Sequence, residues 1–198
     1  MALKRPKRAF RPPGTRKKSD SSQHRRKTQG AEESRLFKAD PLRGVRVAGR
    51  VSGWSVPKAA LAKVLKSYLA ALGLPAAGVE LQLVGDAACQ QLNREHRQVD
   101  APTDVLSFPA ESTVRPGFDG YLGELALDLP YAWRKRGRFH PRFEGEASFL
   151  LLHGLLHLTG VHHDTPAQER ALWRLQDRYF PPAPALLAGL RALRPKAR

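Results

Sequence analysis

The sequence predicts an α/β (α+β) domain in which a small sheet of about four strands is combined with helices. Short segments with alternating apolar residues, the period of a half-buried strand, occur between segments whose apolar residues recur at helical spacing. The chain of 198 residues is long enough for one domain with a substantial core and flanking tails. The predicted strands are residues 45–51, 79–83, the apolar stretch that ends before Pro109, and residues 122–129.

Four segments have the length and periodicity of helices. Pro57 opens the first, whose apolar positions keep one face as far as Gly73. Asp86 is the expected cap of the second, which runs to about Arg97. The other two are residues 143–159 and 166–179, and weaker helical turns are expected at residues 130–138 and 186–193.

The charge distribution divides the chain into three parts. We interpret residues 1–43 as a basic arm expected to be disordered, 44–180 as the domain, and 181–198 as a Pro-rich basic tail. Residues 1–30 carry eleven Lys and Arg against the single acid Asp20, within a net charge of +16. Such a segment buries too little apolar surface to fold alone. It is interpreted as an arm for phosphate backbones, a solvated tail or, less favoured, an organelle transit peptide.

Cysteine content and hydropathy indicate a reducing, cytoplasmic setting. The single cysteine, Cys89, excludes a disulfide framework and is interpreted as a helix packing residue. The sequence has no apolar run of membrane-spanning length and no signal-peptide core near Met1, so no membrane partner is expected.

The strongest chemical signal is a histidine motif on the third predicted helix. His153 and His157 are four residues apart, so both imidazoles project from one helix face at the spacing of two ligands to one metal ion. Gly160 then allows a left-handed turn that ends the helix. A third ligand can return from the following loop, where His163 has the spacing of zinc hydrolases and His162 is the competitor.

The loop after Gly160 is predicted to be short and fixed, because Thr165, Pro166 and Gln168 form a helix-start signature with a capping box. Single histidines on an apolar helix are usually satisfied core residues. Three of them at these offsets would each need a partner, which favours a metal site. Zinc is the favoured ion, because three imidazoles with an open water position are typical of catalytic zinc.

A second polar block, residues 93–109, leads from a helix end through a loop into a strand. Arg97 is either a phosphate ligand or the partner of Asp100 in a surface salt bridge. Asp104 either orients a ligand histidine or caps backbone amides. The cations and aromatic residues of segment 131–138 suit nucleic acid, although a solvated helix face has the same composition.

The two blocks together resemble the YbeY family of metal-dependent bacterial endoribonucleases. The resemblance rests on the sequence HGLLHLTG from His153, on His163, and on DAPTDVLSFP from Asp100, which is preceded by Asn93 and Arg97. The step Leu122-Gly123-Glu124 also matches, and the resemblance covers about residues 44–180.

This resemblance implies a small mixed sheet flanked by helices, with the histidine helix against the sheet. It implies that His153, His157 and His163 bind one zinc ion and that Arg97 faces the same cleft in RNA binding or cleavage. The family usually has Asp where this chain has His162, which is a departure. The implied function is single-strand-specific cleavage in ribosomal RNA processing, including small-subunit 3′-end maturation, and ribosome quality control, with RNA, the ribosome or ribosomal proteins as partners.

The catalytic candidates are Arg97, His153, His162 and Asp164. Zinc held by three imidazoles would acidify a water molecule, so the nucleophile is either zinc hydroxide or the ribose 2′-hydroxyl, with His162 or Asp164 as proton carriers. Zinc proteases with this spacing have a glutamate after the first histidine, where this chain has Gly154, which argues against a metalloprotease. A third hypothesis is a non-catalytic, ribosome-associated RNA-binding protein in which zinc joins two helices.

Overall fold

The computed structural model describes residues 44–110, 114 and 117–197, so the predicted arm at residues 1–43 lies outside the described residues. A four-stranded sheet has the order β1-β3-β5-β4. The outer strand β1 and strand β5 both run parallel to β3, whereas β4 is antiparallel to β5, so the sheet is mixed. Its strands are β1 (Val45–Gly49), β3 (Gly78–Val84), β5 (Tyr121–Asp128) and β4 (Val105–Pro109).

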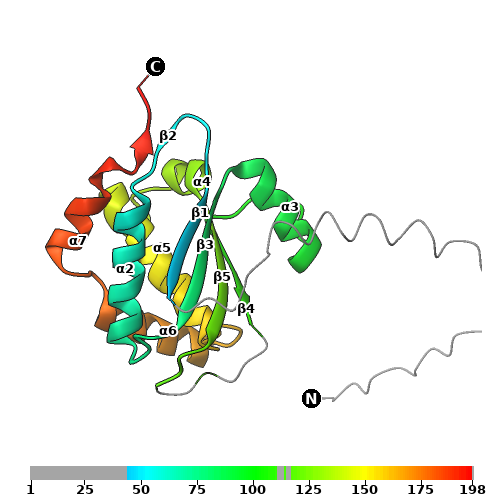
Figure 1. Ribbon diagram of the computed structural model, residues 1–198. Helices are drawn as coiled ribbons and strands as arrows, with labels where there is room; N and C mark the ends of the chain where they lie inside the picture. Colours follow the sequence, from blue (N-terminus) through cyan, green and yellow to red (C-terminus); the bar gives the residue numbers. More distant parts are fainter. Residues whose placement is uncertain (1–43, 111–113, 115–116, 198) are drawn as a thin grey trace, which may run out of the picture. The chain divides into compact units, whose positions relative to one another are not determined.

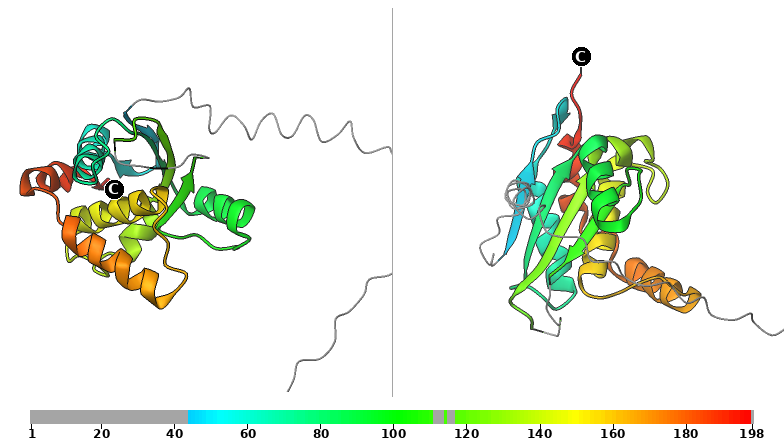
Figure 2. Two further views of the ribbon diagram at one scale, coloured as in Figure 1. Left: turned by 90° about the horizontal axis from the view of Figure 1, so that it is seen from below. Right: turned by 90° about the vertical axis from the view of Figure 1, so that its right-hand side faces the viewer.

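Helices cover the sheet as the resemblance implies. Helices α2 (Lys58–Ala71) and α5 (Phe143–Leu158) lie on one face, and α3 (Asp86–Arg97) lies on the other side (Figures 1 and 2). The predicted apolar face of α2 is buried against the sheet and α5, and Gly73 ends the helix region with φ +76°. The shorter α4 (Leu129–Arg134) follows β5, and α6 (Pro166–Tyr179) follows α5.

The histidine helix α5 is apolar around most of its circumference and is largely buried. Gly154 lets it approach the sheet closely. A Cβ atom at Gly154 would lie 2.7 Å from Leu125 Cδ2 on β5 and 3.3 Å from Ser107 Oγ on β4. The hydroxyl of Ser107 also donates to the Gly154 carbonyl at 3.3 Å. The helix is therefore fixed directly on β5 and on β4, the strand in which the second polar block ends.

Two local expectations differ from the structure. Strand β3 was expected to be half-buried because Glu80 alternates with apolar residues, but Glu80 is only 3% exposed, and the Gln82 side chain donates to its carboxylate. Its carboxylate lies 3.8 Å from Arg46 on β1. Asp86 does not cap α3: the N-cap is Gly85, and Asp86 binds Arg134 instead at 2.7 Å.

The C-terminal segment, expected to be a tail, contains regular structure in the described residues. It forms α7 (Pro184–Gly189), the 3₁₀ turn η1 (Leu190–Ala192) and β6 (Arg194–Pro195), which pairs antiparallel with β2 (Trp54–Ser55). Leu190 and Leu193 are buried in the core, which makes this segment part of the folded unit. None of the helices in the described part of the chain has the length and apolar composition needed to cross a bilayer.

Candidate metal centre

Three histidines converge at the end of α5. One ring nitrogen from each of His153, His157 and His163 lies within 4.8 Å of the other two. The Nε2 atoms of His153 and His157 are 3.1 Å apart, close to the spacing of two nitrogens on one zinc ion. His162, the competing third ligand, is exposed and not a member of this group, and its ring centroid lies 6.3 Å from that of His157.

The loop that carries His163 is fixed at both ends, as predicted. Gly160 has φ +85°, and the amide of Val161 donates to the carbonyl of Leu156 at 3.1 Å, which closes the helix end. At the start of α6, the side chains and backbone of Thr165 and Gln168 form the expected capping box. The chain therefore reverses within a few residues and returns His163 to the histidines of α5.

Further contacts orient the two helix histidines. The Nδ1–H of His157 donates to the carbonyl of Val161 at 2.7 Å, and that of His153 donates to Gln176 Oε1 on α6 at 3.3 Å. With both Nδ1 atoms acting as donors, each Nε2 keeps a lone pair for a metal ion. Sequence reasoning missed Gln176, because a contact across 23 positions leaves no local spacing signal.

Burial keeps the helix histidines in the form that binds metal. Desolvation lowers the pKa of His153, and it lowers the pKa of His157 to about 4, with the neighbouring His153 adding to the shift. Both rings are thus neutral at physiological pH, as ligation requires. A group of three imidazoles suits zinc, and among the described residues no Cys, Asp, Glu or fourth His joins the group. The arrangement fits an ion with one coordination position left for solvent or substrate.

Arg97, at the end of α3, reaches strand β4, on which the histidine helix packs. Its guanidinium donates to the carbonyl of Ser107, at a long 3.5 Å, and Ser107 in turn binds the histidine helix. Burial is the main cause of the lowered pKa of His157, and the positive charge of Arg97 makes a smaller contribution in the same direction. The expected alternative partner, Asp100, pairs with Arg94 at 3.5 Å.

The other candidates of the polar block have structural contacts. Oδ1 of Asp104 accepts from the amide of Val105 at 2.9 Å and from the Thr103 hydroxyl. Of its two interpretations, Asp104 therefore fits the one in which it caps backbone amides.

Cys89 on α3 is buried, its thiol donates to the carbonyl of Thr103, and burial raises its pKa to about 11. These values fit a packing cysteine and exclude a reactive thiolate at neutral pH.

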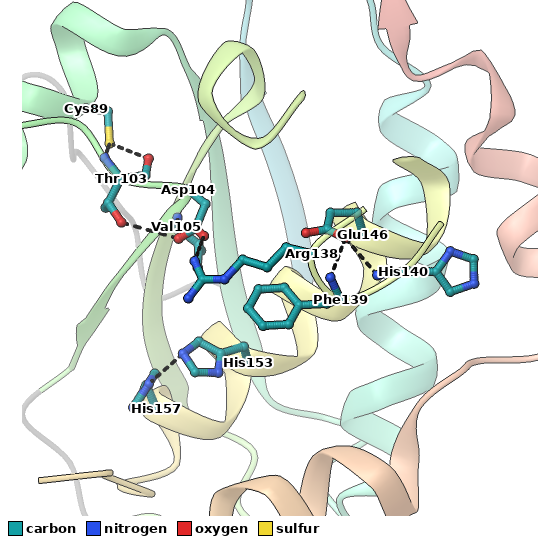
Figure 3. Close-up of polar contacts among 10 residues, drawn as sticks. All are labelled: Cys89, Thr103, Asp104, Val105, Arg138, Phe139, His140, Glu146, His153 and His157. Carbon is teal, nitrogen blue, oxygen red and sulfur yellow. Dashed lines mark hydrogen bonds and ion pairs between the residues drawn. The ribbon is translucent and has the colours of Figure 1, made fainter. Parts of the chain in front are cut away.

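A cavity of about 320 Å³ adjoins the histidines. The segment between α4 and α5 supplies Arg138 and Phe139, which lie between Asp104 and His153 (Figure 3). Sequence reasoning missed this cavity, although it noted the basic segment that forms one wall. Its lining includes Asp104, Arg138, Phe139, Phe149, His153, His163 and Trp173.

Comparison with known proteins identifies the family. A family model described as Endoribonuclease YbeY matches residues 54–182. The chain belongs to the YbeY family. An Endoribonuclease YbeY of Moorella thermoacetica is 44% identical over 115 residues, covering 54% of this chain and 74% of that protein. One from an Anaeromyxobacter species is 43% identical over 108 residues, covering 54% of this chain and 55% of that protein.

A solved structure was also compared. The solution structure of TM1509 from Thermotoga maritima has a TM-score of 0.49 and 24% identity, and covers 68% of this chain and 85% of that one. The family match confirms the expectation of an RNA-cleaving hydrolase, an endoribonuclease whose partner is RNA.

Proposed function

We propose that this YbeY-family chain is a zinc-dependent, single-strand-specific endoribonuclease of the cytoplasm. It acts on ribosomal RNA in small-subunit 3′-end maturation and ribosome quality control, in association with the ribosome or its proteins. The observation that carries the proposal is the convergence of ring nitrogens from His153, His157 and His163 within 4.8 Å. A net charge of +16 favours a polyanionic substrate.

In this proposal the three histidines hold one zinc ion and each has a defined structural task. His153 and His157 supply ligands from a buried helix, and His163 completes the set from the loop. Bound zinc would supply a Lewis acid that polarises a phosphoryl oxygen and acidifies water. Arg97 would bind the non-bridging oxygens of the scissile phosphate and stabilise their charge, because a guanidinium matches phosphate geometry.

His162 and Asp164 flank His163 in sequence and are both exposed, so they are the proposed proton carriers. The nucleophile is either water or the 2′-hydroxyl of the ribose at the cut site. An RNA substrate with a single deoxyribose at that position separates the two routes. Undiminished cleavage excludes the ribose route, and abolished cleavage supports it.

Position 154 argues against peptide hydrolysis as the alternative chemistry. In zinc proteases a glutamate at this position serves as the general base. Here a Cβ atom at Gly154 would point at Leu125 and Ser107 of the sheet rather than into open space. The residue is therefore a packing glycine. When the protein is incubated with a peptide library, we expect no metal-dependent cleavage.

The principal test is His157→Ala in the full chain, with His140→Ala as a matched histidine outside the metal-binding group. We expect His157→Ala to lose bound zinc, measured by elemental analysis, and to lower cleavage of single-stranded RNA at least about 100-fold, as removal of a metal ligand should. His140→Ala should retain both properties. Wild-type cleavage by the His157 variant would refute the zinc-dependent mechanism. A wild type that binds RNA without cleaving it, and that loses mainly stability when His157 is replaced, would favour a structural zinc.

Arg97 is tested by charge reversal. Arg97→Glu should retain its zinc and lose cleavage, since it removes phosphate stabilisation without touching a ligand. Arg94→Glu, at another exposed arginine of the same helix, is the control and should cleave normally. Equal activity of the two variants would remove Arg97 from the proposed mechanism.

A further inference from the structure

The cavity beside the histidines has an aromatic wall. Phe139 and Phe149 stack with ring centroids 4.4 Å apart, and the Trp173 ring lies about 6 Å from both, tilted against them. Trp173 is 40% exposed, and only Val99 is comparable among large apolar side chains of the described residues. An exposed tryptophan at the mouth of a cavity is a typical ligand contact.

Cationic and acidic groups line the same cavity. The Arg138 guanidinium lies 4.7 Å from the centroid of the Phe139 ring, and its Nη1 is 3.9 Å from Asp104 Oδ2. This ion pair is long, and the Arg138 side chain is 62% exposed, so the guanidinium is available to an incoming anion. Figure 3 shows Arg138 extending from the segment before α5 toward Asp104, on the side of α5 that carries His153.

Proximity connects this cavity with the proposed chemistry. His153 and His163 belong both to the cavity lining and to the candidate metal group. When the phosphate of a nucleotide lies at the histidines, the base of that nucleotide or of the adjacent nucleotide is therefore within reach of the aromatic wall. The cavity volume of about 320 Å³ is at the lower end of small-ligand sites, which suits one base and excludes a duplex.

We propose that this cavity is a base-binding subsite of the endoribonuclease, in which Trp173 and Phe139 stack an unpaired nucleobase adjacent to the cut and Arg138 binds the flanking phosphate. The inference rests on the proposed function and deepens it. It assigns strand specificity to particular residues, because a base held in a duplex cannot enter an aromatic cavity without leaving its stack. The occupant is RNA rather than a peptide, because the cation and aromatic faces match phosphate and base.

The test combines a base deletion scan with variants of the subsite. Short, single-stranded 2′-O-methyl oligonucleotides, each with one abasic position, are titrated against the zinc-loaded full chain, and Kd is measured by fluorescence anisotropy after gels show that they stay intact. Removal of the base at one particular position should weaken binding to the wild type about tenfold, which is within the range for loss of one base stack. Trp173→Ala should weaken binding of the intact oligonucleotide by the same factor and abolish the dependence on that position. Trp173→Phe should retain most of the affinity and the dependence on that position.

Arg138→Gln should reduce the slope of log Kd against log salt by about one, as expected for loss of a phosphate contact. Arg174→Gln is the matched control, since Arg174 is an exposed cation on α6 outside the cavity lining. Zinc content should be unchanged in every variant. A flat abasic scan, or the same scan in wild type and Trp173→Ala, would overturn the subsite.

Cleavage of unmodified RNA is measured in parallel to separate this inference from the proposed function. If cleavage depends on zinc but KM is the same for the wild type and Trp173→Ala, only the subsite is refuted. Trp173-dependent binding without any cleavage by the wild type refutes the catalytic proposal and leaves the subsite as an RNA-binding site.

Discussion

The candidate metal centre is assembled from two different regions, the buried helix α5 and the exposed loop at residues 160–164. His153 and His157 are partly buried, and both have hydrogen-bonded Nδ1 atoms. His163 is exposed. Among the described residues, the aromatic rings that its imidazole contacts are those of His153 and His157. Hydrogen bonds to their Nδ1 atoms therefore orient the two helix ligands, whereas the third is positioned by the two fixed ends of its loop.

The largest difference in zinc affinity is expected between the variants His163→Ala and His162→Ala. Because His163 is the loop member of the histidine group, its loss should weaken zinc affinity at least about tenfold while the metal-free protein keeps its stability. His162→Ala should leave zinc affinity nearly unchanged. Competition with a chromophoric chelator measures the affinities. The reverse order would make His162 the third ligand.

Gln176→Leu separates ligand orientation from stability on the helix side. The variant removes the acceptor for His153 Nδ1, so zinc affinity should fall about tenfold. The Nε2 atom of Gln176 is buried without a hydrogen-bond partner among the described residues, so an apolar side chain should keep or raise the free energy of unfolding. Calorimetry of the metal-free protein checks the second expectation. A large loss of stability with unchanged zinc affinity would show that Gln176 is a packing residue only.

The pH dependence of the metal-free protein tests the buried state of His157. Because its pKa is lowered from about 6.5 to about 4, the unfolded chain binds a proton that the folded chain does not between these values. The free energy of unfolding should therefore fall as the pH drops through this interval, by roughly 1–2 kcal/mol. This is less than the roughly 3 kcal/mol that such a shift gives for a fully buried group, because the ring is only half-buried and solvent screens its charge. His157→Gln should remove this part of the slope, as measured by urea denaturation at several pH values. Identical slopes for the two proteins would contradict the burial of this ring.

The smallest effect concerns the loop side. Gly160→Ala should lower the free energy of unfolding by about 1 kcal/mol, because φ is +85° and there is no atom among the described residues for the added Cβ to strike. Gly73→Ala is a matched control with φ +76° and equally open space at the end of α2. Both variants should lose similar stability in denaturant titrations, and only Gly160→Ala should also weaken zinc binding. Equal zinc affinities would mean that the turn does not position His163.

Local patterns predicted the parts of the molecule that are set by local geometry. The spacing of His153, His157 and Gly160 fixes ligand direction and helix end within about two helical turns, and Thr165 with Gln168 predicted the next helix start. The four main strands and the amphipathic α2 follow from periodicity in the same way.

Features that depend on tertiary neighbours could not be predicted. Glu80 alternates as in a solvated strand face, but its strand has a partner on both edges and the side chain is buried. Gln176 and Trp173 reach the site only because α6 packs beside α5, and nothing in their own segment indicates this. The two-residue pairing of β2 with β6 is too short to leave a periodic signal.

The most direct test of the central claim is X-ray absorption spectroscopy at the zinc edge of the zinc-loaded full chain. The account predicts one zinc per chain with three imidazole ligands and one light oxygen ligand from solvent, at distances of about 2.0–2.1 Å. Scattering from a thiolate, from a fourth imidazole or from only two imidazoles would contradict it.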